Sequence, residues 1–133
     1  MERYSVNIKQ ISWLDREGLE AEVLCEVNEA QLWAFCHPCS FRRGETANVY
    51  FDFVQEKISE AAFWNENKES RRVMVPSQST KWRYYCYAQI KSIHPVVVDC
   101  GSITLSFGDW INDERVVGSY IYFVVSRLDV SKI

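Results

Sequence analysis

The feature that most constrains the fold is an alternation of side-chain character with a period of two residues. It is clearest in residues 81–91, with the sequence KWRYYCYAQIK. One set of alternate positions suits a core, and consists of Trp82, Tyr84, Cys86, Ala88 and Ile90. The opposite set is basic, polar or phenolic, and consists of Lys81, Arg83, Tyr85, Tyr87, Gln89 and Lys91. This period predicts a β-strand with one buried face.

Five further segments rich in β-branched and aromatic residues also predict strands. They are residues 21–27, 30–36, 47–54, 95–107 and 119–130. The first two are separated only by Asn28 and Glu29, which predicts a tight hairpin. The last is apolar on both faces, as is typical of a central strand.

One segment has the period of a helix instead. In residues 54–64, Val54, Ile58 and Ala61–Ala62 recur at helical spacing, with polar residues between them. We therefore predict one short helix here.

The order of these elements predicts the fold class. Three early strands, a helix and then two or three strands is the order of an OB-type barrel, a five-stranded and partly open Greek-key barrel. A length of 133 residues corresponds to one domain. We predict an all-β, or β-rich α+β, single domain over residues 1–133: a small OB-like, partly open β-barrel with one short helix around residues 54–64.

The two halves of the chain share a weak similarity. A strand that starts near Ala21 leads to LWAFC, then to Gly44 and the strand NVYFDF. A strand through Ala88 leads to VVVDC, then to Gly118 and the strand YIYFVV. Because the spacings differ, we interpret this as a pattern common to β-meanders rather than as a duplication.

Composition and charge indicate the compartment. The N-terminal residues lack the apolar stretch of a secretory signal, and no run of about 18 apolar residues could span a membrane. Five cysteines, an odd number, favour reduced thiols. We expect a cytoplasmic protein without a membrane partner. The net charge of -3 gives no overall reason to expect a polyanionic partner.

The stretch WAFCHPCS, residues 33–40, raises the question of cysteine chemistry. WAFCHPC resembles the thioredoxin active-site pattern, in which Trp and Ala precede a CxxC pair whose second cysteine follows proline. That chemistry needs a helix N-terminus at the first thiol, whereas a loop and a strand are predicted after Cys39. A zinc site needs four ligands, and Cys36 and Cys39 have no second CxxC pair to join them. We interpret Cys36 and Cys39 as structural thiols and expect no cofactor or metal, although these two are the weak candidates for one.

The polar face of residues 81–91 is the candidate binding surface. It carries Lys81, Arg83, Tyr85, Tyr87, Gln89 and Lys91, which interleave cations with aromatic rings. Single-stranded nucleic acid is bound by such a combination, because cations contact phosphates while rings stack on bases. The alternative is a solvated strand face with cross-strand tyrosine pairs.

No sequence motif indicates catalysis. GxSxG, GxxxxGK[ST], HExxH and GxGxxG are all absent, and Asp109, Asp113 and Glu114 read as a polar loop around Trp110. The chain has more tryptophan and tyrosine than a small core needs, including Trp33, Trp64, Trp82 and Trp110. Tryptophan and tyrosine are frequent anchors of protein interfaces. We therefore predict a non-enzymatic binding module that acts through a protein partner, for example an adaptor or a toxin-neutralising immunity-type protein. The alternative is an OB-like protein that binds single-stranded nucleic acid through residues 81–91.

Overall fold

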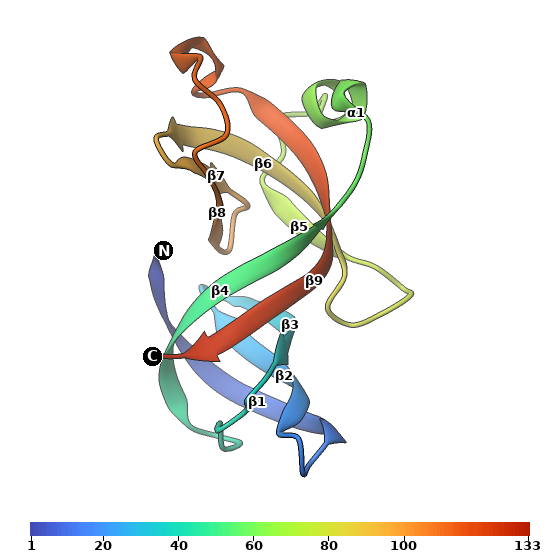
Figure 1. The fold of residues 1–133 in the computed structure, drawn as a ribbon, viewed down its shortest axis with the longest axis vertical. Helices are drawn as coiled ribbons and strands as arrows, with labels where there is room; N and C mark the ends of the chain where they lie inside the picture. The colour runs from blue at the N-terminus through green and yellow to red at the C-terminus, as the bar shows by residue number, and fades with distance from the viewer.

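A single β-sheet of nine strands dominates the computed structural model, which describes residues 1–133 (Figure 1). Along the chain the elements are β1 (Arg3–Asp15), β2 (Glu20–Val27), β3 (Ala30–Cys36), β4 (Thr46–Glu56), α1 (Glu60–Asn65), β5 (Val73–Pro76), β6 (Tyr84–Ile93), β7 (Val96–Asp99), β8 (Thr104–Gly108), the 3₁₀-helix η1 (Glu114–Val116) and β9 (Tyr120–Lys132). The predicted fold class, an all-β and partly open barrel with one short α-helix, is confirmed. Neither helix has the length and apolar character needed to cross a membrane.

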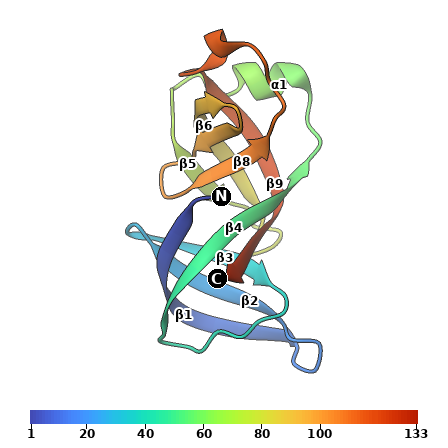
Figure 2. The ribbon, with the colours of Figure 1, turned by 60° about the vertical axis from the view of Figure 1, so that its left-hand side comes forward.

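The sheet forms two lobes that share the strands β4 and β9 (Figures 1 and 2). These strands pair antiparallel from Val49 opposite Lys132 to Glu56 opposite Val124. In the first lobe, here called the closed lobe, the order β3-β2-β1-β4-β9 returns on itself through a parallel bridge between Phe35 and Asp129. In the second, here called the open lobe, β9 is followed by β6, β7 and β8, and β5 pairs with β6.

The two lobes are built from a structural repeat, residues 3–56 and residues 84–132. The strand pairs have equivalent registers: Asn7 opposite Thr46 matches Gln89 opposite Tyr120, Ile8 opposite Cys25 matches Ile90 opposite Val98, and Cys25 opposite Leu32 matches Val98 opposite Leu105. Both repeats have an irregularity just after the isoleucine of their first strand, within the similar sequences NIKQI and QIKSI.

The loop before the last strand of each repeat is also fixed in the same way. Gly44 N–H donates to the carbonyl oxygen of Ile8 at 2.7 Å, and Gly118 N–H donates to that of Ile90 at 2.8 Å. Both glycines have positive φ, which favours glycine. The unequal spacings in the sequence therefore lie in loops, and the interpretation of the similarity as a general meander pattern gives way to a repeat.

The repeats differ at one seam. In the closed lobe β3 reaches β9, whereas the equivalent strands of the open lobe, β8 and β4, do not pair. Aromatic rings fill this seam instead: the centroid of Phe107 lies 5.1 Å from that of Phe53 and 5.0 Å from that of Phe123. Such edge-to-face pairs contribute about 0.5–1.5 kcal/mol each beyond their buried area.

The prediction of a helix over residues 54–64 is wrong at its start. Val54 to Glu56 extend β4, where Val54 lies opposite Arg127 and Glu56 opposite Val124. Pairing with β9 outweighs the local helical spacing, as tertiary contacts commonly do. The helix begins at Glu60 because Ser59 caps it, accepting a hydrogen bond from Ala62 N–H at 3.1 Å.

The structure also differs from the expectation at three places among the strands. The strands β1 and β5 were not predicted. Because of β1, four strands precede the helix rather than three, and the helix does not occupy the position expected for an OB-type barrel. The predicted strand 95–107 is two strands, β7 and β8. The turn between them contains Gly101, which has φ +92° and lies so close to the backbone of Arg72 that a Cβ would clash.

A buried asparagine holds the segment after α1 against the sheet. The side-chain amide of Asn67 donates to the carbonyl oxygens of Arg71 at 2.9 Å and Ile121 at 3.0 Å, and its Oδ1 accepts from Arg71 N–H at 2.9 Å. Asn67 is the only polar residue among the buried residues. It thus joins α1 and β5 to β9.

We predict that Asn67→Ala lowers the free energy of unfolding by about 2 kcal/mol, because it leaves buried backbone groups without partners. Asn65→Ala, an exposed site two residues away, is the matched control and should change stability by less than about 0.5 kcal/mol. Urea denaturation followed by circular dichroism measures both. Equal stability of the two variants would contradict the anchoring role of Asn67.

Candidate functional site

The outward face of β6 carries four of the six predicted binding residues. Arg83 immediately precedes the strand, and Tyr85, Tyr87 and Gln89 lie along it, all partly buried. On the neighbouring strands this face continues with Tyr122 and Tyr120 of β9 and with Val73 and Val75 of β5. The face is therefore more aromatic than basic.

Arg83 is committed to contacts within the protein. Its guanidinium donates to both oxygens of the Glu56 carboxylate, at 2.9 Å to Oε2 and 3.3 Å to Oε1, and to the hydroxyl of Tyr85 at 2.9 Å. The hydrogen bonds with Glu56 raise the pKa of Arg83, and the hydrogen bond from Arg83 lowers the pKa of Tyr85. Its charge is thus largely compensated before any ligand arrives.

The two other tyrosines of this face form a cluster with Arg71. The ring centroids of Tyr87 and Tyr122 are 5.2 Å apart, and the Arg71 guanidinium lies 4.8 Å from the centroid of Tyr87. Burial, followed by the neighbouring Tyr87, raises the pKa of Tyr122. These are the cross-strand contacts of the alternative interpretation, although Arg71 itself remains exposed.

Lys81 and Lys91 do not join this face. The Lys81 ammonium lies 4.3 Å from the centroid of Trp33, in the closed lobe. Lys91 falls at the register irregularity between Ile90 and Ser92 and lines a different hollow, together with Glu2 and Thr104. The strand irregularity thus ends the continuous basic stripe that strict alternation predicts.

The CxxC segment is a strand end followed by a loop. Cys36 ends β3, the His37–Pro38 peptide bond is cis, and Cys39 is buried with its N–H donating to the carbonyl oxygen of Leu19 at 2.8 Å. Burial raises the pKa of the Cys36 thiol and brings that of Cys25 to about 12. All five cysteines are buried and free, and no group of three or more His, Cys, Asp or Glu side chains is placed to hold a metal ion.

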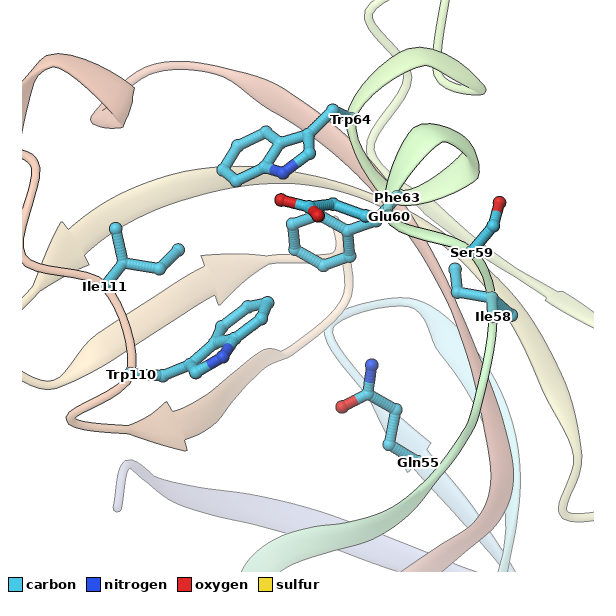
Figure 3. A pocket seen from close by; sticks show the side chains of 8 residues that line it. All are labelled: Gln55, Ile58, Ser59, Glu60, Phe63, Trp64, Trp110 and Ile111. Atoms are coloured by element: carbon cyan, nitrogen blue, oxygen red, sulfur yellow. The ribbon is translucent and has the colours of Figure 1, made fainter.

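An aromatic concave site lies elsewhere, at the seam of the open lobe. It is a groove of about 480 Å³ between α1 and the loop after β8 (Figure 3). Its apolar lining consists of Ile58, Phe63, Trp64, Trp110 and Ile111. Gln55, Ser59 and Glu60 complete it. We call it the tryptophan groove.

Three rings define the shape of the tryptophan groove. Phe63 is buried and lies between the two indoles, with centroids 4.9 Å from Trp64 and 5.2 Å from Trp110. Its plane stands at 85° to that of Trp64 and 84° to that of Trp110. Trp110 also stacks on Phe107 at 5.6 Å, yet 53% of its surface is exposed. The rings are thus held in place by packing while one wall stays open to solvent.

Only part of this site could be predicted from the sequence. Trp64 and Trp110 were recognised as possible interface anchors, but nothing in the alternation connects residues 55–64 with residues 110–111. The connection arises because β4 and β8 belong to different repeats and meet only across the unpaired seam. The signal that could have indicated it is the repeat itself.

We predict that all five thiols react slowly with Ellman's reagent at pH 8 in the native protein and rapidly after denaturation. Burial makes all five thiols inaccessible, and it raises the pKa of Cys25 and Cys36, which lowers the fraction of the reactive thiolate there. A fast native phase lost in Cys36→Ala or Cys39→Ala would contradict this and support thiol–disulfide chemistry. Cys86→Ala is the control from the opposite lobe.

Comparison with known proteins adds no assignment to this geometry. No protein-family model, no curated protein and no solved structure matches the chain. The tryptophan groove combines a concave shape with the half-exposed indole of Trp110, the one aromatic side chain that is exposed rather than buried or partly buried.

Proposed function

We propose that this protein is a non-enzymatic binding module that acts through a protein partner, and that the tryptophan groove is its binding surface. The observation that carries the proposal is the half-exposed Trp110 beside the buried Phe63. Tryptophan in a concave, partly desolvated position is the side chain most enriched among the hot spots of protein interfaces.

Preorganisation supports this role. Phe63 contacts both tryptophans edge-on, and Phe107 supports Trp110 from a second side. A partner would therefore meet rings that already have fixed positions, and association would cost little additional side-chain entropy. The lining combines five apolar side chains with Gln55, Ser59 and Glu60, and protein interfaces likewise combine apolar contact area with polar groups.

The chemistry of the groove supports binding rather than catalysis. Glu60 is its one titratable lining side chain, so no acid–base pair faces a bound molecule there. The hydroxyl of Ser59 caps α1 and is engaged by Ala62 N–H. The groove thus offers contact area and one negative charge, without an activated nucleophile.

A peptide selection tests the proposal. We expect a phage-displayed random peptide library, selected on the immobilised protein, to give peptides that bind Trp110→Ala at least about tenfold more weakly. Ile111→Ser should weaken them too, which covers the case in which loss of the Trp110 ring disturbs the loop. Leu14→Ala removes an exposed apolar side chain on β1, remote from the groove, and should leave affinity unchanged. Peptides that bind all variants equally, or no enrichment at all, would contradict the proposal.

Single-stranded nucleic acid is the second candidate, and the observation in its favour is the cluster of Tyr87, Tyr122 and Arg71 on the face of the open lobe. If this second function held, labelled oligonucleotides would bind in a saturable, salt-sensitive way, and Arg71→Glu would weaken that binding at least about fivefold. Arg16→Glu, an equal charge change in the closed lobe, is the control. We expect no saturable binding in fluorescence anisotropy, because Arg83 is compensated by Glu56 and the lysines point elsewhere.

A further inference from the structure

We infer that the tryptophan groove receives a lysine or arginine side chain of the partner protein, held against the exposed surfaces of Trp64 and Trp110 with Glu60 as its counter-ion. This inference rests on the proposed function, since it names the chemistry that the same groove recognises. Three features carry it: the arrangement of the rings, the unpaired carboxylate and the amphipathic lining.

The rings present a suitable site for a cation. The plane of Phe63 is nearly perpendicular to the planes of both indoles, and Trp64 and Trp110 stand on either side of it as two walls. Figure 3 shows Trp64 and Trp110 on opposite sides of the groove, with the Glu60 carboxylate near Phe63 between them. A guanidinium or ammonium over the face of tryptophan is attracted by the ring quadrupole, more strongly than over other aromatic rings.

Glu60 is free to act as the counter-ion. The protein contains five ion pairs, which use Asp99, Glu56, Asp113, Asp129 and Glu45. Glu60 takes part in none of them and accepts no side-chain hydrogen bond, and no basic residue lines the groove. Lys57 lies nearby in the sequence but is exposed and outside the lining, and Arg115 is paired with Asp113. The groove therefore carries an uncompensated negative charge.

The lining matches the two parts of a long basic side chain. Lysine and arginine have an apolar stem and a charged head, and the stem packs on apolar surface while the head keeps polar contacts. Ile58 and Ile111 provide apolar surface, and Glu60 provides the carboxylate. A volume of about 480 Å³ holds such a side chain together with part of its neighbouring backbone. An acidic side chain would face Glu60 without a counter-ion, so anionic segments are disfavoured.

The test uses short capped peptides that are identical except for a central lysine, arginine, norleucine or glutamate. Binding is followed by the indole N–H signals of the ¹⁵N-labelled protein, which has five tryptophans. Trp64→Phe and Trp110→Phe assign two of those signals. We expect the lysine and arginine peptides to shift both signals and to bind about tenfold more tightly than the norleucine peptide, with the glutamate peptide weakest.

The charge of Glu60 is tested with a matched pair of variants. Glu60→Gln should weaken the lysine peptide about fivefold and leave the norleucine peptide unchanged, since only the charged head contacts the carboxylate. Glu17→Gln makes the same change in net charge in the exposed turn between β1 and β2, and should affect neither peptide.

The outcomes separate this inference from the proposed function. Equal affinity for the lysine and norleucine peptides would overturn the cation inference while the groove remained a docking site. Failure of the lysine and arginine peptides to shift either indole signal at millimolar concentration would also overturn it. The proposed function itself stands or falls with the peptide selection on Trp110→Ala, which imposes no charge on the ligand.

Discussion

The antiparallel pairing of β4 with β9 is the interaction on which the rest of the structure depends. Each of these strands belongs to both lobes, because one half of it pairs within its own repeat and the other half crosses into the opposite one. Val124 shows this directly, since it lies opposite Glu56 of β4 on one side and Tyr85 of β6 on the other. The Arg83–Glu56 ion pair lies next to these residues and also links β4 to the start of β6. The two lobes are therefore joined by side-chain as well as backbone contacts. A second link lies away from this pairing, where Thr104 N–H of β8 donates to the hydroxyl of Tyr4 in β1 at 2.7 Å.

The two repeats differ in whether their third strand pairs with the last strand of the other repeat, and this difference explains where the groove lies. In the closed lobe the bridge between Phe35 and Asp129 brings β3 to β9, and the strands form a ring. In the open lobe β8 stops short of β4, and Phe53, Phe107 and Phe123 occupy the space that a further strand contact would have filled. Aromatic rings close this seam by packing, without the backbone hydrogen bonds that a strand pair would form. At the rim of the seam, part of the aromatic surface stays exposed. Trp110, which is half exposed and contacts both Phe63 and Phe107, lies at that rim.

The sequence predicted what depends on local alternation and missed what depends on distant pairing. The inward positions of β6, such as Cys86, Ala88 and Ile90, are buried as the period of two requires. The helix was expected from Val54 because the apolar residues there have helical spacing. Residues 54–56 instead pair with β9, and a local sequence pattern cannot indicate this distant pairing. Lys91 was placed on the binding face because alternation was continued through a register irregularity. The tryptophan groove could not be predicted for the same reason, since one wall comes from α1, between the two repeats, and the other from the loop after β8 in the second repeat.

The position of β9 along the chain has a consequence for how the protein is made. The strands β1 to β8 emerge from the ribosome before it, yet β9 completes the ring of the closed lobe and lines β6 in the open lobe. Neither repeat can therefore complete its sheet before β9 has been synthesised, although each contains a local three-stranded meander. The contact between Phe35 and Asp129 spans most of the chain, and such distant contacts form slowly because the intervening loop must first be ordered. Until β9 has been synthesised, the nascent chain holds two incomplete sheets, and β4 and β6 both lack the strand with which they pair.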